Sequence, residues 1–197
     1  SFVRECGGEF IPAAHEGSTI LMAAAYAHVS GNVGVATVTH GPALTNCVTT
    51  LVEASRMHTP LVILAGDTPV ANPRHLQSID QRELVKVTGA GFVQLRSPTT
   101  VTEDVAQAFY RAQVERRPIV LNMPADFMWQ EMDHATKVLD VFTKPGGVAE
   151  GDTLDNAIGM IASARRPLIL AGGGAIHARD ELVRLAERLE APLATTL

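Results

Sequence analysis

The acidic residue Glu16 is the first candidate for chemistry, because it stands directly after a turn and at the start of a predicted helix. In open α/β sheets, ligands bind at the carboxyl edge of the strands, which is where such a turn lies. A carboxyl group there could exchange a proton with a ligand or accept a hydrogen bond from it. A purely structural interpretation stays open at this point, since the helix macrodipole favours an acidic residue in any first turn.

The turn of residues 39–46, THGPALTN, is the second candidate, since a strand runs here into Gly41 and Pro42 and then into a helix. Glycine lets the backbone come close to whatever occupies the strand ends, where a helix N-terminus also offers its N–H groups. His40 in the same turn could be a base or an orienting donor, or a solvent-facing loop residue.

Two further turns carry weaker signals. Asp67, in the sequence GDTP of residues 66–69, follows a strand and is interpreted as a turn cap. The sequence LAGGGAIHA, residues 170–178, resembles a dinucleotide fingerprint and would suit a nucleotide-binding oxidoreductase. His177 stands where the third glycine of that fingerprint belongs, so a tight turn between a strand and a helix is the better interpretation.

The composition limits the kinds of partner. A net charge of -5 and a pI near 5.8 argue against nucleic acid or an anionic membrane as the main partner. Cys6 and Cys47 fit neither a disulfide framework nor a zinc motif. No apolar run approaches the ~18–20 residues that a membrane span needs. We therefore expect a cytoplasmic protein that binds a small molecule.

Strands alternate with helices along the first two thirds of the chain, which predicts an α/β fold whose parallel sheet has helices on both faces. Apolar and β-branched runs predict the strands, and apolar residues at helical spacing predict the helices. The predicted strands are residues 1–6, 33–40, 60–66, 90–96 and 118–124, and the predicted helices are residues 15–31, 41–58 and 100–117.

A second domain is predicted beyond a linker. Residues 126–151 break the alternation and carry the turn cluster KPGG, which is typical of a linker. The pattern then resumes as a truncated second α/β domain over residues 152–197, after a first domain of residues 1–125. Its predicted elements are a helix at 151–166, a strand at 167–174, a helix at 175–190 and a strand at 191–197.

In order and spacing, these segments resemble the acetolactate synthase-like family of thiamine diphosphate enzymes. Residues 15–31 resemble the segment H-E-x-x-A-x-x-x-A-x-G-Y-A-R-x-x-G, and residues 39–46 resemble the turn T-S-G-P-G-A-T-N. Residues 75–91 are similar to the F-Q-x-x-D loop, with Gln77 on the glutamine and Asp80 on the acid. Residues 116–127 resemble the closing strand R-G-P-V-x-L-x-I-P-x-D.

The resemblance implies a role for each matched residue. The first domain would be the pyrimidine-binding domain without its first strand and helix, and the second would be the start of the middle domain. The carboxyl of Glu16 would hydrogen-bond a ring nitrogen of the cofactor's aminopyrimidine and so activate the cofactor, with its pKa raised towards neutrality by burial. Gly41, Pro42 and Asn46 would lie against the cofactor, whereas the substrate pocket would include His40, Leu76 and Gln77.

The resemblance also implies cofactors and partners. Thiamine diphosphate would be bound with Mg²⁺, whose ligands would lie outside this chain, and FAD is possible in the middle domain. The substrate would be a 2-oxo acid, and the active site would form between two subunits of a homodimer or tetramer, so that the chain alone would be inactive.

Several departures leave the substrate open. His40 replaces the usual serine, Ala43 the second glycine and Leu76 an aromatic residue, while Ala24 and Ala25 stand where Glu-Gly is common. A decarboxylase for an acyl-CoA or aromatic 2-oxo acid, and a non-catalytic module of the same fold, therefore remain alternatives.

Overall fold

The computed structural model describes residues 7–72, 74–130, 147 and 150–196. The chain divides into two compact units, residues 1–145 and residues 146–197. The predicted strand at 1–6 and most of the predicted linker, residues 131–146 and 148–149, lie outside the described residues.

The first unit is built on a four-stranded sheet in which every neighbouring pair is parallel. Its strands, in their order across the sheet, are β1 (Gly34–Val38), β2 (Leu61–Asp67), β4 (Pro118–Pro124) and β3 (Gly91–Gln94). Parallel pairing brings the carboxyl ends of all four strands to one edge. In the register there, Asn122 of β4 lies opposite Ala65 on one side and Gln94 on the other.

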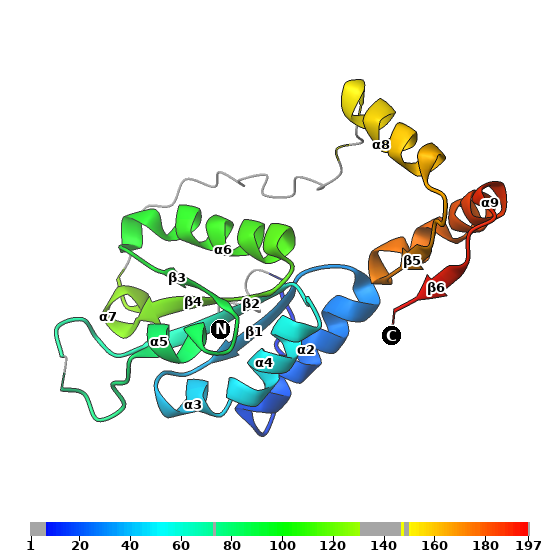
Figure 1. Ribbon diagram of the computed structural model, residues 1–197. Helices are drawn as coiled ribbons and strands as arrows, with labels where there is room; N and C mark the ends of the chain where they lie inside the picture. The colour runs from blue at the N-terminus through cyan, green and yellow to red at the C-terminus, as the bar shows by residue number, and fades with distance from the viewer. Residues whose placement is uncertain (1–6, 73, 131–146, 148–149, 197) are drawn as a thin grey trace. The chain divides into compact units, whose positions relative to one another are not determined.

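Helices cover both faces of this sheet, so the predicted α/β fold is confirmed (Figure 1). The helices α2 (Glu16–Ser30), α4 (Val48–Arg56) and α5 (Gln81–Lys86) pack on one face. On the other face lies α6 (Val101–Glu115), which follows a short 3-10 turn, η1 (Pro98–Thr100). The short helices α3 (Pro42–Thr45) and α7 (Ala125–Met128) follow β1 and β4.

Two apolar clusters fill the layers on either side of the sheet. Successive residues of a strand point to opposite faces, so a strand covered on both faces is apolar along most of its length, as β2 is up to Gly66 and β4 up to Leu121. Under α2 and α4 lies a cluster that includes Ile20, Leu44, Leu51, Leu61, Ile63 and Val120, and under α6 lies one that includes Val62, Val93, Ala108, Ile119 and Leu121.

Three details differ from the sequence prediction. The short helix α7 overlaps the start of the segment that was predicted as a linker. The helix predicted at 41–58 is interrupted at Asn46 and Cys47, which separate α3 from α4. Here the N–H of Cys47 bonds the carbonyl of Leu44, three residues back, and the hydroxyl of Thr45 bonds the carbonyl of Pro42, so the turn tightens. The helix α5 was not predicted; the side chain of Asp80 caps it by accepting the N–H of Glu83.

The second unit contains the four elements predicted for it. They are α8 (Asp152–Ser163), β5 (Ile169–Ala171), α9 (Arg179–Leu189) and β6 (Leu193–Thr195). The strands β5 and β6 pair in parallel, with Ile169 opposite Leu193. A 3-10 segment, η2 (Gly173–Ala178), joins β5 to α9. The glycine-rich sequence therefore forms a turn between a strand and a helix, as predicted from the absence of the third glycine of a dinucleotide fingerprint.

Candidate functional site

Glu16 is the first residue of α2, and the side chain of the preceding residue caps this helix. His15 has extended backbone angles, and its Nδ1 accepts the N–H of Gly17 at 3.0 Å. At the other end, Gly31 adopts a left-handed conformation and closes the helix on the carbonyl of Ala27. Because α2 runs antiparallel to the strand that follows it, Glu16 lies at the carboxyl edge of the sheet.

Glu16 and Asn46 form a pair at this edge, although they are 30 residues apart in the sequence. The side-chain amide of Asn46 donates from Nδ2 to Oε2 of Glu16 at 3.1 Å. The break between α3 and α4 places Asn46 here, since that residue ends α3. Two residues predicted to meet the cofactor are therefore in contact with each other.

The pKa of the Glu16 carboxyl is lowered, which corrects the expectation that burial raises it. The main cause is a backbone N–H at its own position, followed by the Asn46 amide, and the neighbouring His15 lowers the pKa further. Burial acts in the opposite direction but is outweighed, because the described residues leave this side chain only half-buried.

The Gly41 turn packs against the loop that carries Gln77. Gly41 has φ 60° and ψ -113°, a conformation that side chains disfavour. A Cβ atom at this position would lie 2.1 Å from the carbonyl oxygen of Gln77, so only glycine allows this approach. Pro42 follows as the exposed first residue of α3.

Two histidines meet beside this turn. The rings of His40 and His75 lie edge to face with their centroids 5.5 Å apart. Nδ1 of His75 accepts the N–H of Gln77 at 3.2 Å, while Nε2 of His40 is buried without a hydrogen-bond partner among the described residues. The side chain of the adjacent Leu76 is 97% exposed.

A buried cluster of amide side chains, which the sequence analysis missed, lies behind the Gly41 turn. Gln81 and Asn122 are 3% and 1% exposed and bond each other. Their other partners include Gly41, Asp67 and Gln94. Asn122 was recognisable in the sequence as the one polar residue inside the strand PIVLNMP, whereas no pattern singled out Gln81.

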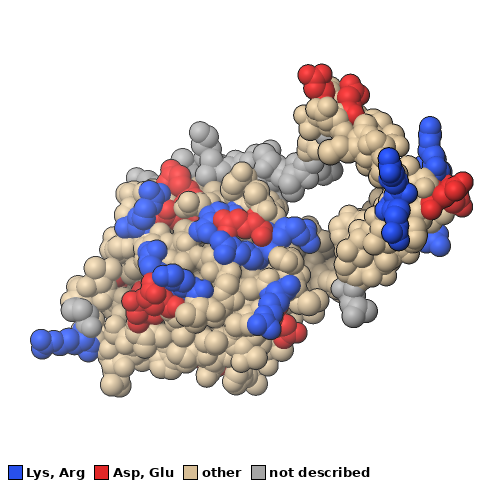
Figure 2. Space-filling model, viewed as in Figure 1, with Lys and Arg blue, Asp and Glu red and all other residues tan. Residues whose placement is uncertain are grey.

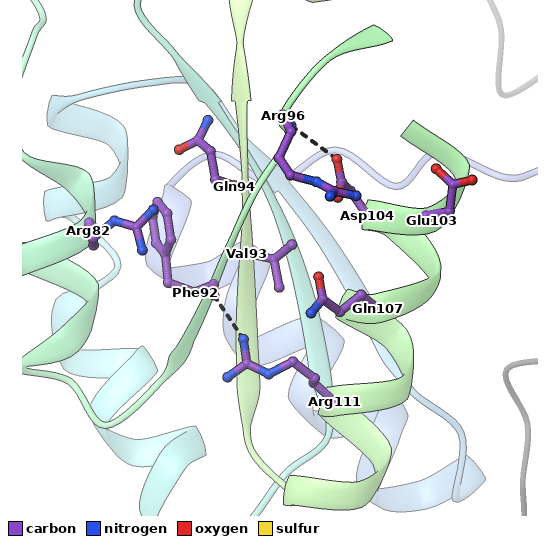
Figure 3. Close-up of a pocket in the computed structure, with 9 residues that line it drawn as sticks. All are labelled: Arg82, Phe92, Val93, Gln94, Arg96, Glu103, Asp104, Gln107 and Arg111. Atoms are coloured by element: carbon purple, nitrogen blue, oxygen red, sulfur yellow. Dashed lines mark hydrogen bonds and ion pairs between the residues drawn. The ribbon is translucent and has the colours of Figure 1, made fainter. Parts of the chain in front are cut away.

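The hollow shown in Figure 3 includes Gln94 of this cluster in its lining, but none of the site residues predicted from the sequence. It has a volume of about 710 Å³ and lies between β3 and α6, with three arginines around it. Arg82 stacks 4.5 Å from the centre of the Phe92 ring, Arg96 bonds Asp104 at 2.7 Å, and Arg111 donates to the carbonyl of Phe92 at 2.9 Å. Basic and acidic side chains also alternate over the face of this unit seen in Figure 2, so this face carries no continuous basic patch.

Neither a metal cluster nor a membrane helix is found within the described ranges. Nowhere in them do three or more His, Cys, Asp or Glu side chains gather as a metal site would require. Their helices are also too short or too polar to cross a bilayer.

Two family models match the chain, one in each unit. Residues 2–84 match the N-terminal TPP-binding domain of thiamine pyrophosphate enzymes, where TPP is thiamine diphosphate under its other name. Residues 154–197 match the central domain of the same enzymes.

The curated relatives are enzymes of this kind. A sulfoacetaldehyde acetyltransferase of Alcaligenes xylosoxydans xylosoxydans is 35% identical over 96% of the chain and 32% of its own length. A probable acetolactate synthase large subunit of Methanococcus aeolicus is 35% identical over 93% of the chain and 32% of its own length. A probable 2-ketoarginine decarboxylase of Pseudomonas aeruginosa is 34% identical over 93% of the chain and 34% of its own length.

The chain spans about a third of the length of these relatives. Within that third, the order of the matched domains follows the order of the two units. The chain belongs to the thiamine pyrophosphate enzyme family.

Proposed function

We propose that this chain forms the cofactor-activating part of a longer enzyme that uses thiamine diphosphate to decarboxylate a 2-oxo acid. The pair of Glu16 and Asn46 carries the proposal, because it places a half-open carboxyl at the carboxyl edge of the sheet. The Gly41 turn, five residues before Asn46, packs its backbone against the loop that carries Gln77. A planar aminopyrimidine with one ring nitrogen to bond fits these groups.

The task of Glu16 would be to hold a proton against that ring nitrogen. Asn46 fixes one carboxyl oxygen by a 3.1 Å hydrogen bond and so orients the group. The chain's own residues lower the pKa of Glu16. A ring lying over the carboxyl would displace water from it, and this desolvation would raise the pKa and favour a shared proton. When bound, thiamine diphosphate supplies the electron sink for decarboxylation.

His40, Leu76 and Gln77 would face the substrate. The hydrogen bond from Gln77 N–H to His75 fixes the backbone of the loop, and the half-buried side chain of Gln77 remains available. His40 would contribute its buried Nε2, which has no partner among the described residues, as a donor or acceptor to the substrate. The exposure of Leu76 leaves it open to contact with a substrate or a second subunit.

Other parts of the site would come from outside the described residues. Mg²⁺ would be held by ligands elsewhere in the longer protein, and a second subunit would complete the active site. The middle domain could bind FAD. The relatives differ in reaction, so transfer of the decarboxylated product to an acceptor is an alternative to its simple release.

The test is carbon dioxide release by the full-length enzyme from pyruvate and a panel of 2-oxo acids, with and without thiamine diphosphate and Mg²⁺. We expect Glu16→Gln to lower kcat by about 100- to 10,000-fold, the range for lost proton transfer, while the cofactor still binds. The matched control is Glu53→Gln, at an exposed position on α4. Near-normal turnover in Glu16→Gln would contradict the assignment, and failure of the wild type to bind the cofactor would favour the non-catalytic alternative.

A further inference from the structure

The buried amide cluster crosses the carboxyl edge of the sheet from strand to strand. Asp67 and Gln94 end β2 and β3, and Asn122 lies two residues before the end of β4, the strand between them. All three point to the same face, since they continue the alternation of Ile63, Val120 and Phe92. Gln81, at the start of α5, reaches into the cluster from that face.

Hydrogen bonds run through the cluster in one direction. Asn122 donates from Nδ2 to Asp67 Oδ2 at 2.6 Å and to Gln94 Oε1 at 3.0 Å. Its Oδ1 accepts from Nε2 of Gln81, which also donates to the carbonyl of Gly66 at 2.9 Å. Oε1 of Gln81 is thereby left to accept the N–H of Gly41 at 2.8 Å.

Asp67 determines the donor-to-acceptor direction of these hydrogen bonds. A carboxylate can only accept, so Asn122 must present its NH₂ group to Asp67 and its carbonyl to Gln81. Gln81 must then present its NH₂ group to Asn122 and its carbonyl oxygen to Gly41. Reversing one amide would set acceptor against acceptor at the next contact. The charge on Asp67 thus determines how Gln81 meets the Gly41 turn.

The Gly41 turn in turn fixes the candidate site. Its backbone approaches the carbonyl of Gln77 so closely that a Cβ atom would not fit. Asn46, which bonds Glu16, ends the short helix that begins directly after Gly41. The same turn therefore links the loop of Gln77 to the pair of Glu16 and Asn46.

We propose that Gln81 is a positioning residue, oriented through Asn122 by Asp67, which holds the Gly41 turn so that Glu16 and Gln77 meet cofactor and substrate together. The proposal rests on the proposed function for its catalytic consequence. A purely apolar strand end would fill the same space, but it would offer nothing to hold the N–H of Gly41.

An exchange of charge between two members tests the proposal. Asn122→Asp sets two carboxylates against each other where an amide now donates at 2.6 Å. Adding Asp67→Asn restores a carboxylate paired with an amide, and the new carboxylate at position 122 can still accept from Gln81. The exposed residue Asn32 supplies the control Asn32→Asp, which makes the same chemical change outside the cluster.

In the full-length enzyme, we expect Asn122→Asp to lower kcat by about tenfold or more and the double variant to recover most of that loss, as a directly coupled pair should. The cofactor dissociation constant should change less than kcat, because Glu16 and the Mg²⁺ ligands proposed elsewhere in the longer protein are unchanged. Hydrogen exchange at the Gly41 amide should accelerate in Asn122→Asp and slow again in the double variant. Asn32→Asp should change none of these quantities.

Unchanged kcat and unchanged exchange at Gly41 in a folded Asn122→Asp enzyme would overturn the proposal, as would a double variant no better than the single one. If the wild type shows no cofactor-dependent activity, the proposed function fails, and the exchange of the Gly41 amide still decides whether the cluster holds the turn. If the double variant recovers thermal stability but neither kcat nor the slow hydrogen exchange of the Gly41 amide, the cluster has a structural role only.

Discussion

Gly41 and Gly31 both have positive φ but differ in the atoms that surround them. Comparing substitutions at the two positions therefore separates the energetic cost of backbone strain from that of steric overlap. Gly41 (φ 60°) meets the carbonyl of Gln77, whereas Gly31 (φ 73°) has no atom within 4 Å of where a Cβ would stand. We expect Gly41→Ala to lower the free energy of unfolding by about 3 kcal/mol or more, through strain and overlap together. Gly31→Ala should lower it by about 1 kcal/mol, through conformation alone.

Native-state hydrogen exchange of the β2 and β4 amides measures both changes within the first unit. Equal losses in the two variants would contradict the close packing of Gly41 against Gln77.

The hydrogen bond from Asn46 to Glu16 predicts a dependence of stability on pH. Because the pKa of Glu16 is lowered in the folded state, its charge stabilises the fold above the unfolded pKa. That contribution is lost as the pH falls through the folded pKa. We expect Asn46→Ala to raise the pKa of Glu16, and to be less stable than the wild type at neutral pH by an amount that shrinks on acidification.

Carboxyl NMR titration gives the pKa of Glu16, and unfolding at several pH values gives the difference in stability. Asn32→Ala, which alters an exposed amide, is the control. A Glu16 pKa that stays the same in Asn46→Ala would show that the amide does not bond the carboxylate in solution.

At the scale of elements, the carboxylate of Asp104 holds the start of α6 against the end of β3. Asp104 is 1% exposed and accepts from the N–H and Nε of Arg96 at 3.0 and 2.7 Å, and from the hydroxyl of Thr100 at 2.8 Å. We expect Asp104→Ala to destabilise the unit by about 3 kcal/mol, as removal of a buried charged partner does.

Arg96→Ala provides the contrast, because the Arg96 side chain is 62% exposed and the backbone N–H that Asp104 accepts would remain. A loss of about 1 kcal/mol or less is expected there. The same hydrogen exchange measures both losses in the free energy of unfolding. Comparable losses would show that the ion pair with Arg96, rather than the buried hydrogen bonds of Asp104, provides most of the stabilisation.

The sequence predicted the elements that bury an apolar stripe or run. Three such elements are present: the strands at 60–66 and 118–124, which are apolar runs, and the helix at 15–31, which has both an apolar stripe and recognisable caps. The helix at 41–58 was predicted as continuous because no residue type at Asn46 or Cys47 marks a break. The six residues of α5 are too few for a periodic pattern to be recognisable.

The candidate site was predictable only in part. Glu16, Gly41, Asn46 and Gln77 came from an ordered resemblance, but their mutual contacts depend on the crossing of segments that lie 30 or more residues apart. The lowered pKa of Glu16 could not be foreseen, since it reflects a backbone hydrogen bond at Glu16 and then the Asn46 amide rather than residue type. The role of Gln81 emerges only once its bonds are seen.

At the scale of the whole molecule, α2 presents an exposed apolar face that the described part of the first unit leaves uncovered. Val29 is 86% exposed and Tyr26 56%, and Leu21 and Met22 extend the same face. A second copy of the chain is the expected occupant, because under the proposed function a second subunit would complete the site at the start of this helix. We predict that the full-length enzyme is at least a dimer, and that Val29→Glu raises its dissociation constant about tenfold or more.

If the two subunits complete one site, activity must follow association. The specific activity of Val29→Glu should then fall on dilution and return at high enzyme concentration, since mass action restores the dimer. The control is Val87→Glu, which charges another exposed valine, 76% exposed, outside α2. Analytical ultracentrifugation at the concentrations used for the assay links the two quantities. A Val29→Glu enzyme that dissociates yet keeps full activity would show that one subunit suffices, and one that neither dissociates nor loses activity would place the contact on another face.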